Sequence, residues 1–262
     1  MTLFDGDIRH RLEKLINIAD MEVRQDFYNG FIVDENDYTS NLTSHIRRII
    51  NAALPLNFYT HSQKLPPSQE RSWGADAMVV LIDHDTKLGK ISFFEAKVDR
   101  ANWDYLQKSS SLSHFSTQLD RQTHAIECGY AVWEQFYSKE SIRTPSKGHR
   151  DPRGSSCIIH ALAANLRQPL PNAIIWKDAD VDSLCKTQTE SSLPITMGEM
   201  IRMICECRYG TPYGISHILN FFNEKINVSD ILVIEGSSRP SSELEENFAD
   251  IISQKIDMNC HD

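Results

Sequence analysis

Residues 74–97 read GADAMVVLIDHDTKLGKISFFEAK, and this stretch decides the fold of the chain. Residues 77–82 are apolar and favour a β-strand, whereas residues 83–89 are polar and end in glycine, which is typical of a turn. The chain then becomes apolar again through Ile91, Phe93 and Phe94. The pattern therefore predicts a β-hairpin made of two buried strands.

The charged residues of this stretch are expected to meet at one end of the hairpin. Successive side chains of a strand point to opposite faces of the sheet, so Glu95 and Lys97 should share one face. Asp76 lies at the start of the partner strand. We therefore expect three charged side chains to converge where the two strands begin and end.

Two carboxylates and a lysine in this arrangement suit metal-dependent hydrolysis of a phosphodiester bond. Carboxylates hold hard cations such as Mg2+, and a bound cation polarises a phosphodiester oxygen and lowers the pKa of a bound water. Lys97 would stabilise charge that develops near the attacking water. The alternative is an ordinary solvated hairpin end. The apolar strand before Glu95 favours the functional interpretation, as do the small residues Gly74 and Ala75, which let another group approach closely.

Asp76 followed by Glu95-Ala96-Lys97 resembles the PD-(D/E)xK nuclease superfamily, which includes type II restriction endonucleases, Holliday-junction resolvases and the cutting subunits of some transposases. The resemblance covers roughly residues 31–125, and Ala75 stands where many members have proline. It implies a restriction-endonuclease-like α/β core with a central mixed sheet flanked by helices. It also implies an Mg2+-dependent endonuclease acting on DNA, with Mn2+ as a substitute for Mg2+.

The resemblance implies further site residues. Members usually carry an acid on or just before a helix that precedes the hairpin, and Glu35 is the first choice for it, with Asp37 second. Many members also place a glutamine on the helix after the lysine, and Gln118 best matches that position. The implied metal ligands are thus Asp76, Glu95 and Glu35, with Lys97 assisting the attacking water and Gln118 steadying the site.

Each of these assignments has a structural alternative. The acids at positions 35 and 37 would also complement the positive N-terminus of the amphipathic helix that follows, whose N-cap we expect at Thr39 or Ser40. Gln118 and Gln122 share one helix face, and the alternative for them is exposure to solvent.

The rest of the chain alternates helices and strands, which indicates an α/β sheet with additional C-terminal α/β elements. We predict helices over residues 7–28, 197–207, 215–225 and 242–257, and strands over residues 155–164, 173–176 and 231–234. A further helix is predicted to open at Ser116 and to carry Trp133 and Phe136 on its apolar side. Residues 178–194 are polar and predict a loop, and His160 is expected to be a core residue of its strand.

A chain of 262 residues suits one large domain or one domain with an appended subdomain. We assign residues 1–140 to the nuclease core with its N-terminal helices. Residues 141–262 carry no recognisable motif. They are either the C-terminal part of the same domain or an appended subdomain for specificity or partner docking.

The net charge of −9 argues against a protein that coats nucleic acid non-specifically, because phosphate contacts favour basic surfaces. Local basic groups would then have to contact the backbone. The predicted contacts are Lys147, Arg150 and Arg153, from a loop rich in glycine and proline, and Arg121 beside the glutamines. The alternatives are a solvated loop and, for Arg121, an ion pair with Asp120 or Glu127.

Composition and motifs exclude several other classes. No apolar stretch approaches the ~18 residues of a membrane span, and the first residues lack a signal-peptide pattern. The six cysteines have neither metal-site nor disulfide spacing, which favours reduced cysteines in the cytoplasm. Metallohydrolase, nucleophile-elbow, Walker and dinucleotide motifs do not occur.

The resemblance also implies partners. These are DNA and either a second copy of the chain in a homodimer or a sensor or motor protein, as in multi-subunit bacterial defence systems. Two alternatives stay open, namely an RNase with the same site and a catalytically silent scaffold or partner-binding module on the same fold. The intact set of Asp76, Glu95 and Lys97 argues against the silent form.

Overall fold

The computed structural model describes residues 2–54, 57–65, 73–98, 102–138, 155–188, 194–223, 228–237 and 248–260. Its strands are β1 (Phe58–Lys64), β2 (Ala77–Asp83), β3 (Leu88–Val98), β4 (Ala131–Tyr137), β5 (Ser156–Ile159), β6 (Tyr213–Gly214) and β7 (Asp230–Gly236). They form one seven-stranded sheet in the order β1-β7-β2-β3-β4-β5, with β6 paired to β3.

The sheet is mixed. The β7–β2 and β3–β4 pairs are parallel, whereas the β1–β7, β2–β3 and β4–β5 pairs are antiparallel. The predicted hairpin is confirmed, since β2 and β3 pair from Ala77 opposite Phe94 to Asp83 opposite Leu88. The expected α/β class with a central mixed sheet is confirmed as well.

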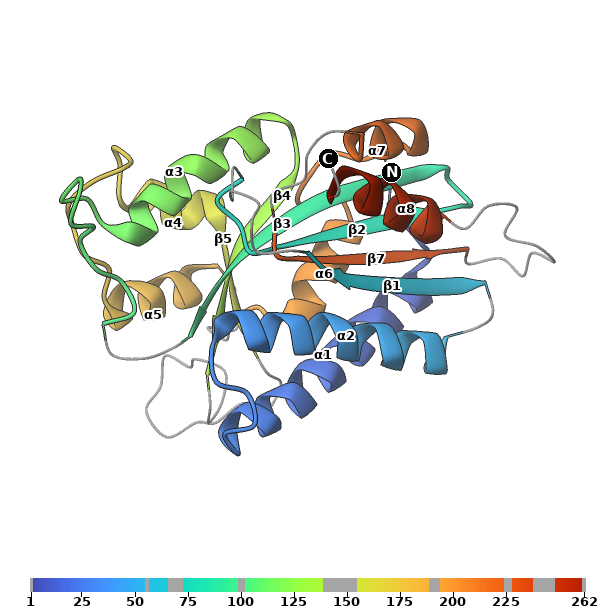
Figure 1. Cartoon of the computed structure of the whole chain (residues 1–262), viewed down its shortest axis with the longest axis horizontal. Coiled ribbons are helices and arrows are strands. Elements are labelled where there is room, and N and C mark those ends of the chain that lie inside the picture. The colour runs from blue at the N-terminus through green and yellow to red at the C-terminus, as the bar shows by residue number, and fades with distance from the viewer. Residues whose placement is uncertain are drawn as a thin grey trace.

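Helices cover both faces of the sheet (Figure 1). They are α1 (Gly6–Tyr28), α2 (Glu35–Ala53), α3 (His114–Glu127), α4 (His160–Leu166), α5 (Asp178–Thr187), α6 (Met197–Cys205), α7 (Ile215–Phe221) and α8 (Phe248–Cys260). The buried side chains of α1, α2 and α6 form the core on one face, and those of α3, α4, α5, α7 and α8 pack on the other. None of the helices that the structure describes is long and apolar enough to cross a membrane.

The apolar run of β2 is explained by burial on both faces. Val79 and Leu81 belong to the core beneath α1 and α2, whereas Met78 and Val80 belong to the core beneath α7 and α8. A strand covered on both faces needs apolar residues at every position, not at every second one.

The prediction of one helix from Ser116 to Phe136 was wrong. Helix α3 ends at Glu127, Gly129 follows with a φ of 79°, and Trp133 and Phe136 lie on β4. Because β4 is paired on both sides and buried along its length, its aromatic and β-branched residues are favoured as a strand. The pairing of β4 with β3 and β5 therefore determined the secondary structure of this segment. The spacing of its apolar residues alone did not.

Other element boundaries also differ from the predictions. The N-cap of α2 is Asp34, whose side chain accepts a hydrogen bond from the Asp37 amide at 2.8 Å, not Thr39 or Ser40. The strand predicted over 155–164 ends at Ile159, where α4 begins, and residues 173–176 are not a strand. Helix α5 lies inside the predicted loop, because Val181, Leu184 and Cys185 fall at helical spacing and are buried.

The two halves of the chain share the sheet. Strand β7, near the C-terminus, lies between β1 and β2 and pairs with both. Figure 1 shows this red strand among the blue-green N-terminal ones. The C-terminal half therefore supplies an interior strand of the sheet.

Candidate active site

Asp76 is fixed against β3 by its backbone and its side chain. Its amide donates to the carbonyl of Phe94 at 2.9 Å, and its Oδ2 accepts from the amide of Ala96 at 2.8 Å. The Asp76 carboxylate therefore contacts β3 at the residue that separates Glu95 from Lys97. With only 1% of its surface exposed, Asp76 is held in a closed environment.

Glu95 and Lys97 form a buried ion pair on the same face of β3, as the alternation of side chains predicted. Lys97 Nζ donates to Glu95 Oε1 and, at 3.0 Å, to the carbonyl of Ala96. The two residues are 1% and 4% exposed. The three charged residues of the hairpin are thus brought together.

The pKa values of the pair reflect burial and crowding of like charge. Burial raises the pKa of Glu95 well above its ordinary value, the charge of Asp76 raises it further, and Lys97 offsets part of the rise. Burial lowers the pKa of Lys97, but the carboxylates of Glu95, Asp76 and Glu35 outweigh it and raise the pKa. Lys97 is therefore protonated near neutral pH.

Helix α3 covers the charged residues with two glutamines. Gln118 Nε2 donates to Glu95 Oε1, which brings Gln118 to the site as the resemblance implied. Gln122 Nε2 donates to the carbonyl of Gly74 at 2.9 Å and to Glu134 Oε2 at 3.3 Å. Since both glutamines are buried, the alternative of two solvent-exposed side chains is wrong.

Glu134 is a fourth ionisable residue of the cluster that was not predicted. It lies on β4 opposite Glu95 in the parallel register, so both carboxylates extend from the same face of the sheet. Burial raises the pKa of Glu134 to about 8, although the hydrogen bond from Gln122 and the charge of Lys97 lower it. An interpretation of residues 131–137 as a strand would have placed Glu134 on one face with the apolar residues Val132 and Phe136. A single acid on such a face would have indicated a further site residue.

The buried cluster holds more acceptor oxygens than donors. Among the described residues, no hydrogen-bond donor reaches four buried oxygens, namely Glu95 Oε2, Glu134 Oε1, Gln118 Oε1 and Gln122 Oε1. Buried polar atoms are normally paired, and buried carboxylates need a compensating charge. Oxygens of this kind fit a hard divalent cation, because Mg2+ prefers oxygen ligands.

No set of three or more His, Cys, Asp or Glu side chains within the described ranges already has the arrangement of a metal site. The carboxylates instead contact Lys97 and the glutamines. Binding of a cation would therefore require side-chain adjustment within the cluster.

Glu35 and Asp37 differ in their surroundings. Glu35 lies in the first turn of α2, is partly exposed, and its charge raises the pKa of Lys97. The hydroxyls of Thr39 and Tyr137, 2.9 Å apart, anchor this end of α2 beside β4. Asp37 accepts hydrogen bonds from Val33 and Asn41 of its own segment. The first choice, Glu35, is thus the acid whose charge acts on the cluster.

Gly74, two residues before Asp76, allows helix α3 to approach closely. Gly74 has a φ of 63°, and a Cβ on it would lie 2.9 Å from both the Cβ of Arg121 and the carbonyl of Gln118. The group expected to approach Gly74 closely is therefore α3 itself. This approach brings both glutamines over the carboxylates.

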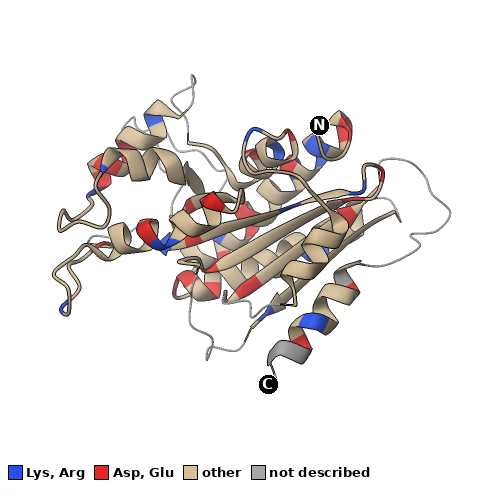
Figure 2. Cartoon of the chain, turned by 90° about the horizontal axis from the view of Figure 1, so that it is seen from above, with Lys and Arg blue, Asp and Glu red and all other residues tan. Residues whose placement is uncertain are grey.

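Basic side chains near the site are few among the described residues. Arg121 is exposed on α3. Lys147, Arg150 and Arg153, the other predicted nucleic-acid contacts, lie outside the described residues. Figure 2 shows Lys and Arg interspersed with Asp and Glu over the ribbon. The described surface thus offers local, not continuous, positive charge.

Comparison of the chain with protein-family models, with curated protein sequences and with solved structures finds no match.

Proposed function

We propose that this chain is a divalent-metal-dependent endonuclease that hydrolyses phosphodiester bonds of DNA on a restriction-endonuclease-like core. One observation carries the proposal. Asp76, Glu95 and Glu134 meet in a buried cluster in which Lys97 donates to Glu95, and no donor from the described residues reaches Glu95 Oε2 or Glu134 Oε1. Such a site is better suited to binding a cation than to stabilising the core of the protein.

The proposed metal ligands are the carboxylates of Asp76 and Glu95, with Glu35 approaching from α2 and Glu134 from β4. When bound, Mg2+ or Mn2+ would polarise a phosphodiester oxygen and lower the pKa of a bound water. These residues present oxygen ligands from different strands and one helix, which matches the preference of these ions for carboxylates.

The other residues of the cluster have distinct proposed roles. Lys97 carries a proton and a positive charge at Nζ, so it would stabilise negative charge that develops on the attacked phosphate and assist the attacking water. Gln118 donates to one oxygen of Glu95 and thereby orients the carboxylate. Gln122 orients Glu134 in the same way and also holds the carbonyl of Gly74.

The rival proposal is a catalytically silent scaffold on the same fold. A scaffold would gain little from this cluster, because a buried ion pair is often less stabilising than apolar residues of similar volume. Strongly perturbed carboxylates gathered at one end of a sheet are more typical of functional sites. The choice of DNA, and of a homodimer or a sensor or motor partner, rests on the resemblance alone.

Cleavage assays test the proposal. Purified protein with Mg2+ or Mn2+ is expected to nick supercoiled plasmid, and Lys97→Ala should reduce the rate by roughly 100-fold or more while circular dichroism shows an intact fold. Lys186→Ala, on the exposed side of α5, is the matched control. DNA and RNA of the same sequence separate a DNase from an RNase.

Two outcomes would contradict the proposed function. If neither nucleic acid is cut with either metal, alone or with a bound partner, the scaffold proposal replaces this one. Equal activity of Lys97→Ala and the Lys186→Ala control would also reject the proposed role of the cluster.

A further inference from the structure

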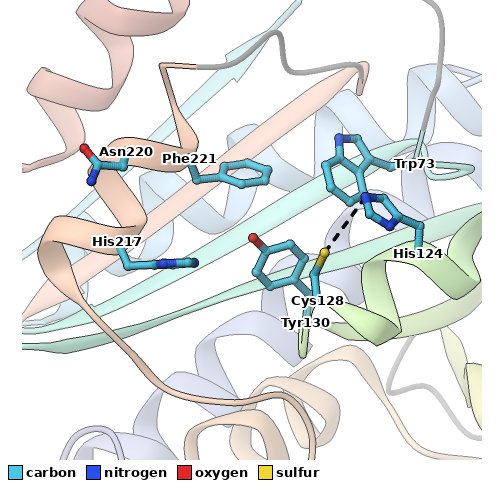
Figure 3. A pocket seen from close by; sticks show the side chains of 7 residues that line it. All are labelled: Trp73, His124, Cys128, Tyr130, His217, Asn220 and Phe221. Atoms are coloured by element: carbon cyan, nitrogen blue, oxygen red, sulfur yellow. Dashed lines mark hydrogen bonds between the residues drawn. The ribbon is translucent and has the colours of Figure 1, made fainter.

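A cavity of about 270 Å³ is lined by Trp73, His124, Cys128, Tyr130, His217, Asn220 and Phe221 (Figure 3). None of the cluster residues lines it, so it is a separate feature. Among the residues that the structure describes, its lining contains five aromatic or imidazole side chains and no Asp, Glu, Lys or Arg. The volume is slightly below the range of about 300–1,000 Å³ for drug-sized ligands, which suits a single small ring system.

The rings around the cavity already stack on one another. Trp73 lies between Phe93 and His124, with centroid distances of 5.2 and 5.1 Å and interplanar angles of 16° and 13°. On the other side, His217 stacks on Tyr213 at 4.2 Å and 15°. Each stack ends in an exposed imidazole, one from α3 and one from α7. These exposed rings are surfaces on which another planar ring can stack.

The cavity is tied to the cluster through two segments. Trp73 precedes Asp76 by three residues, and Gln122 binds the carbonyl of Gly74 between them. Helix α3 carries Gln118 over the carboxylates and His124 at the cavity. At 1.5 Å per residue, these two positions are about 9 Å apart along the helix. A nucleotide with its phosphate at the cluster would therefore bring a neighbouring base within reach of the cavity.

A thiol nucleophile is a weaker interpretation of the same cavity. Cys128 Sγ lies 3.9 Å from His124 Nε2, which resembles a Cys–His pair. However, Cys128 is the C-cap of α3, whereas reactive cysteines on helices typically lie at the N-terminus. The cavity is therefore better suited to binding than to covalent chemistry.

We infer that this cavity binds one unstacked nucleobase of the nucleic-acid substrate. The inference rests on the proposed nuclease function and specifies how the strand is held. Stacking on aromatic and imidazole rings tolerates every base, since each base has a π-face. The described lining residues include no Asp, Glu, Lys or Arg, which suits a neutral base, whereas the phosphates would remain outside.

Binding to single strands with and without bases tests the inference. The probes are a fluorescent oligothymidine and an oligomer of equal length and charge made only of abasic residues, both in EDTA so that cleavage does not contribute. Wild-type protein is expected to bind oligothymidine roughly tenfold more tightly than the abasic strand. His124→Ala and His217→Ala, which remove exposed rings, should each reduce that preference several-fold. Ser216→Ala, exposed on the same helix as His217, should retain it.

The outcomes separate the two proposals. Equal affinity of the wild-type protein for both strands, no binding to either strand, or an unchanged preference in the histidine variants would overturn the base-binding inference even if plasmid is cut. A clear base preference without cleavage under any metal would support the cavity and reject the nuclease.

Discussion

Glu95 uses its two carboxylate oxygens differently. Lys97 and Gln118 both donate to Oε1, whereas the buried Oε2 receives no donor from the residues that the structure describes. Glu134 shows the same asymmetry, since Gln122 donates to Oε2 and no donor in the described part of the chain reaches Oε1. One oxygen of each carboxylate is therefore oriented by the protein and the other is available to a cation.

Thermal unfolding with and without Mg2+ or Mn2+ tests this asymmetry independently of cleavage. A ligand at one hundred times its Kd stabilises the folded state by about 2.7 kcal/mol, so both ions should raise the Tm of the wild-type protein. Glu95→Gln should abolish the rise and Glu134→Gln should weaken it. Glu127→Gln, exposed on α3, should behave as wild type. An undiminished rise in Glu95→Gln would exclude Glu95 as a ligand.

At the scale of elements, the site is assembled by α3 packing across the start of β2. The close approach at Gly74 brings Gln118 and Gln122 over β3 and β4. On its other side α3 is held by α4, because His160 Nε2 donates to the carbonyl of Leu119 at 2.9 Å. His160 is thus the predicted core residue, although it begins a helix and does not lie in a strand.

Substituting Gly74 should loosen this packing. Gly74→Ala would combine a left-handed backbone with a Cβ that crowds α3, and we expect a loss of about 1–3 kcal/mol in the free energy of unfolding together with lower cleavage. Gly30→Ala is a matched control, because Gly30 has a φ of 82° but nothing lies within 4 Å of its Cβ position. Urea unfolding measures both variants. Equal losses would mean that backbone strain alone, and not the approach of α3, requires glycine at position 74.

His160 should make stability depend on pH. Burial lowers its pKa below the ordinary value of 6.5, and the bond to Leu119 only partly offsets this. Because the folded state resists protonation of the imidazole, the contribution is present above pH 6.5 and is lost as pH falls through the lowered pKa. His160→Gln can keep the donor to Leu119 without titrating, so its free energy of unfolding should fall less between neutral and mildly acidic pH. Parallel urea titrations that give the same pH slope would contradict this.

At the scale of the whole molecule, the sheet requires both halves of the chain. Strand β1 pairs with β7 over its full length, and β7 also pairs with β2. Leu232 and Ile234 of β7 complete the core beneath α1 and α2, and Ile231 and Val233 complete the opposite one. Removing β7 would leave the facing edges of β1 and β2 unpaired and would expose both hydrophobic cores.

A fragment of residues 1–140 is therefore expected not to fold on its own. Its circular dichroism should show no cooperative thermal transition, because β1 and β2 would lose their shared partner. Co-expression with residues 141–262 is the positive control and should restore a soluble complex. A cooperatively folded 1–140 fragment would contradict the shared sheet.

The sequence alone determined the hairpin and the meeting of Asp76, Glu95 and Lys97. Alternation of side chains along a strand and the chemistry of a short turn are local, so neighbouring residues suffice to predict them. Tertiary structure alone decided that Glu134 joins the cluster, that α3 is the group next to Gly74, and that β7 lies beside β2. These features depend on which distant segments pair and in what register. The spacing of apolar residues does not specify this pairing. Residues 131–137 are compatible with either a helix or a strand, and only their hydrogen bonding to β3 and β5 makes them a strand.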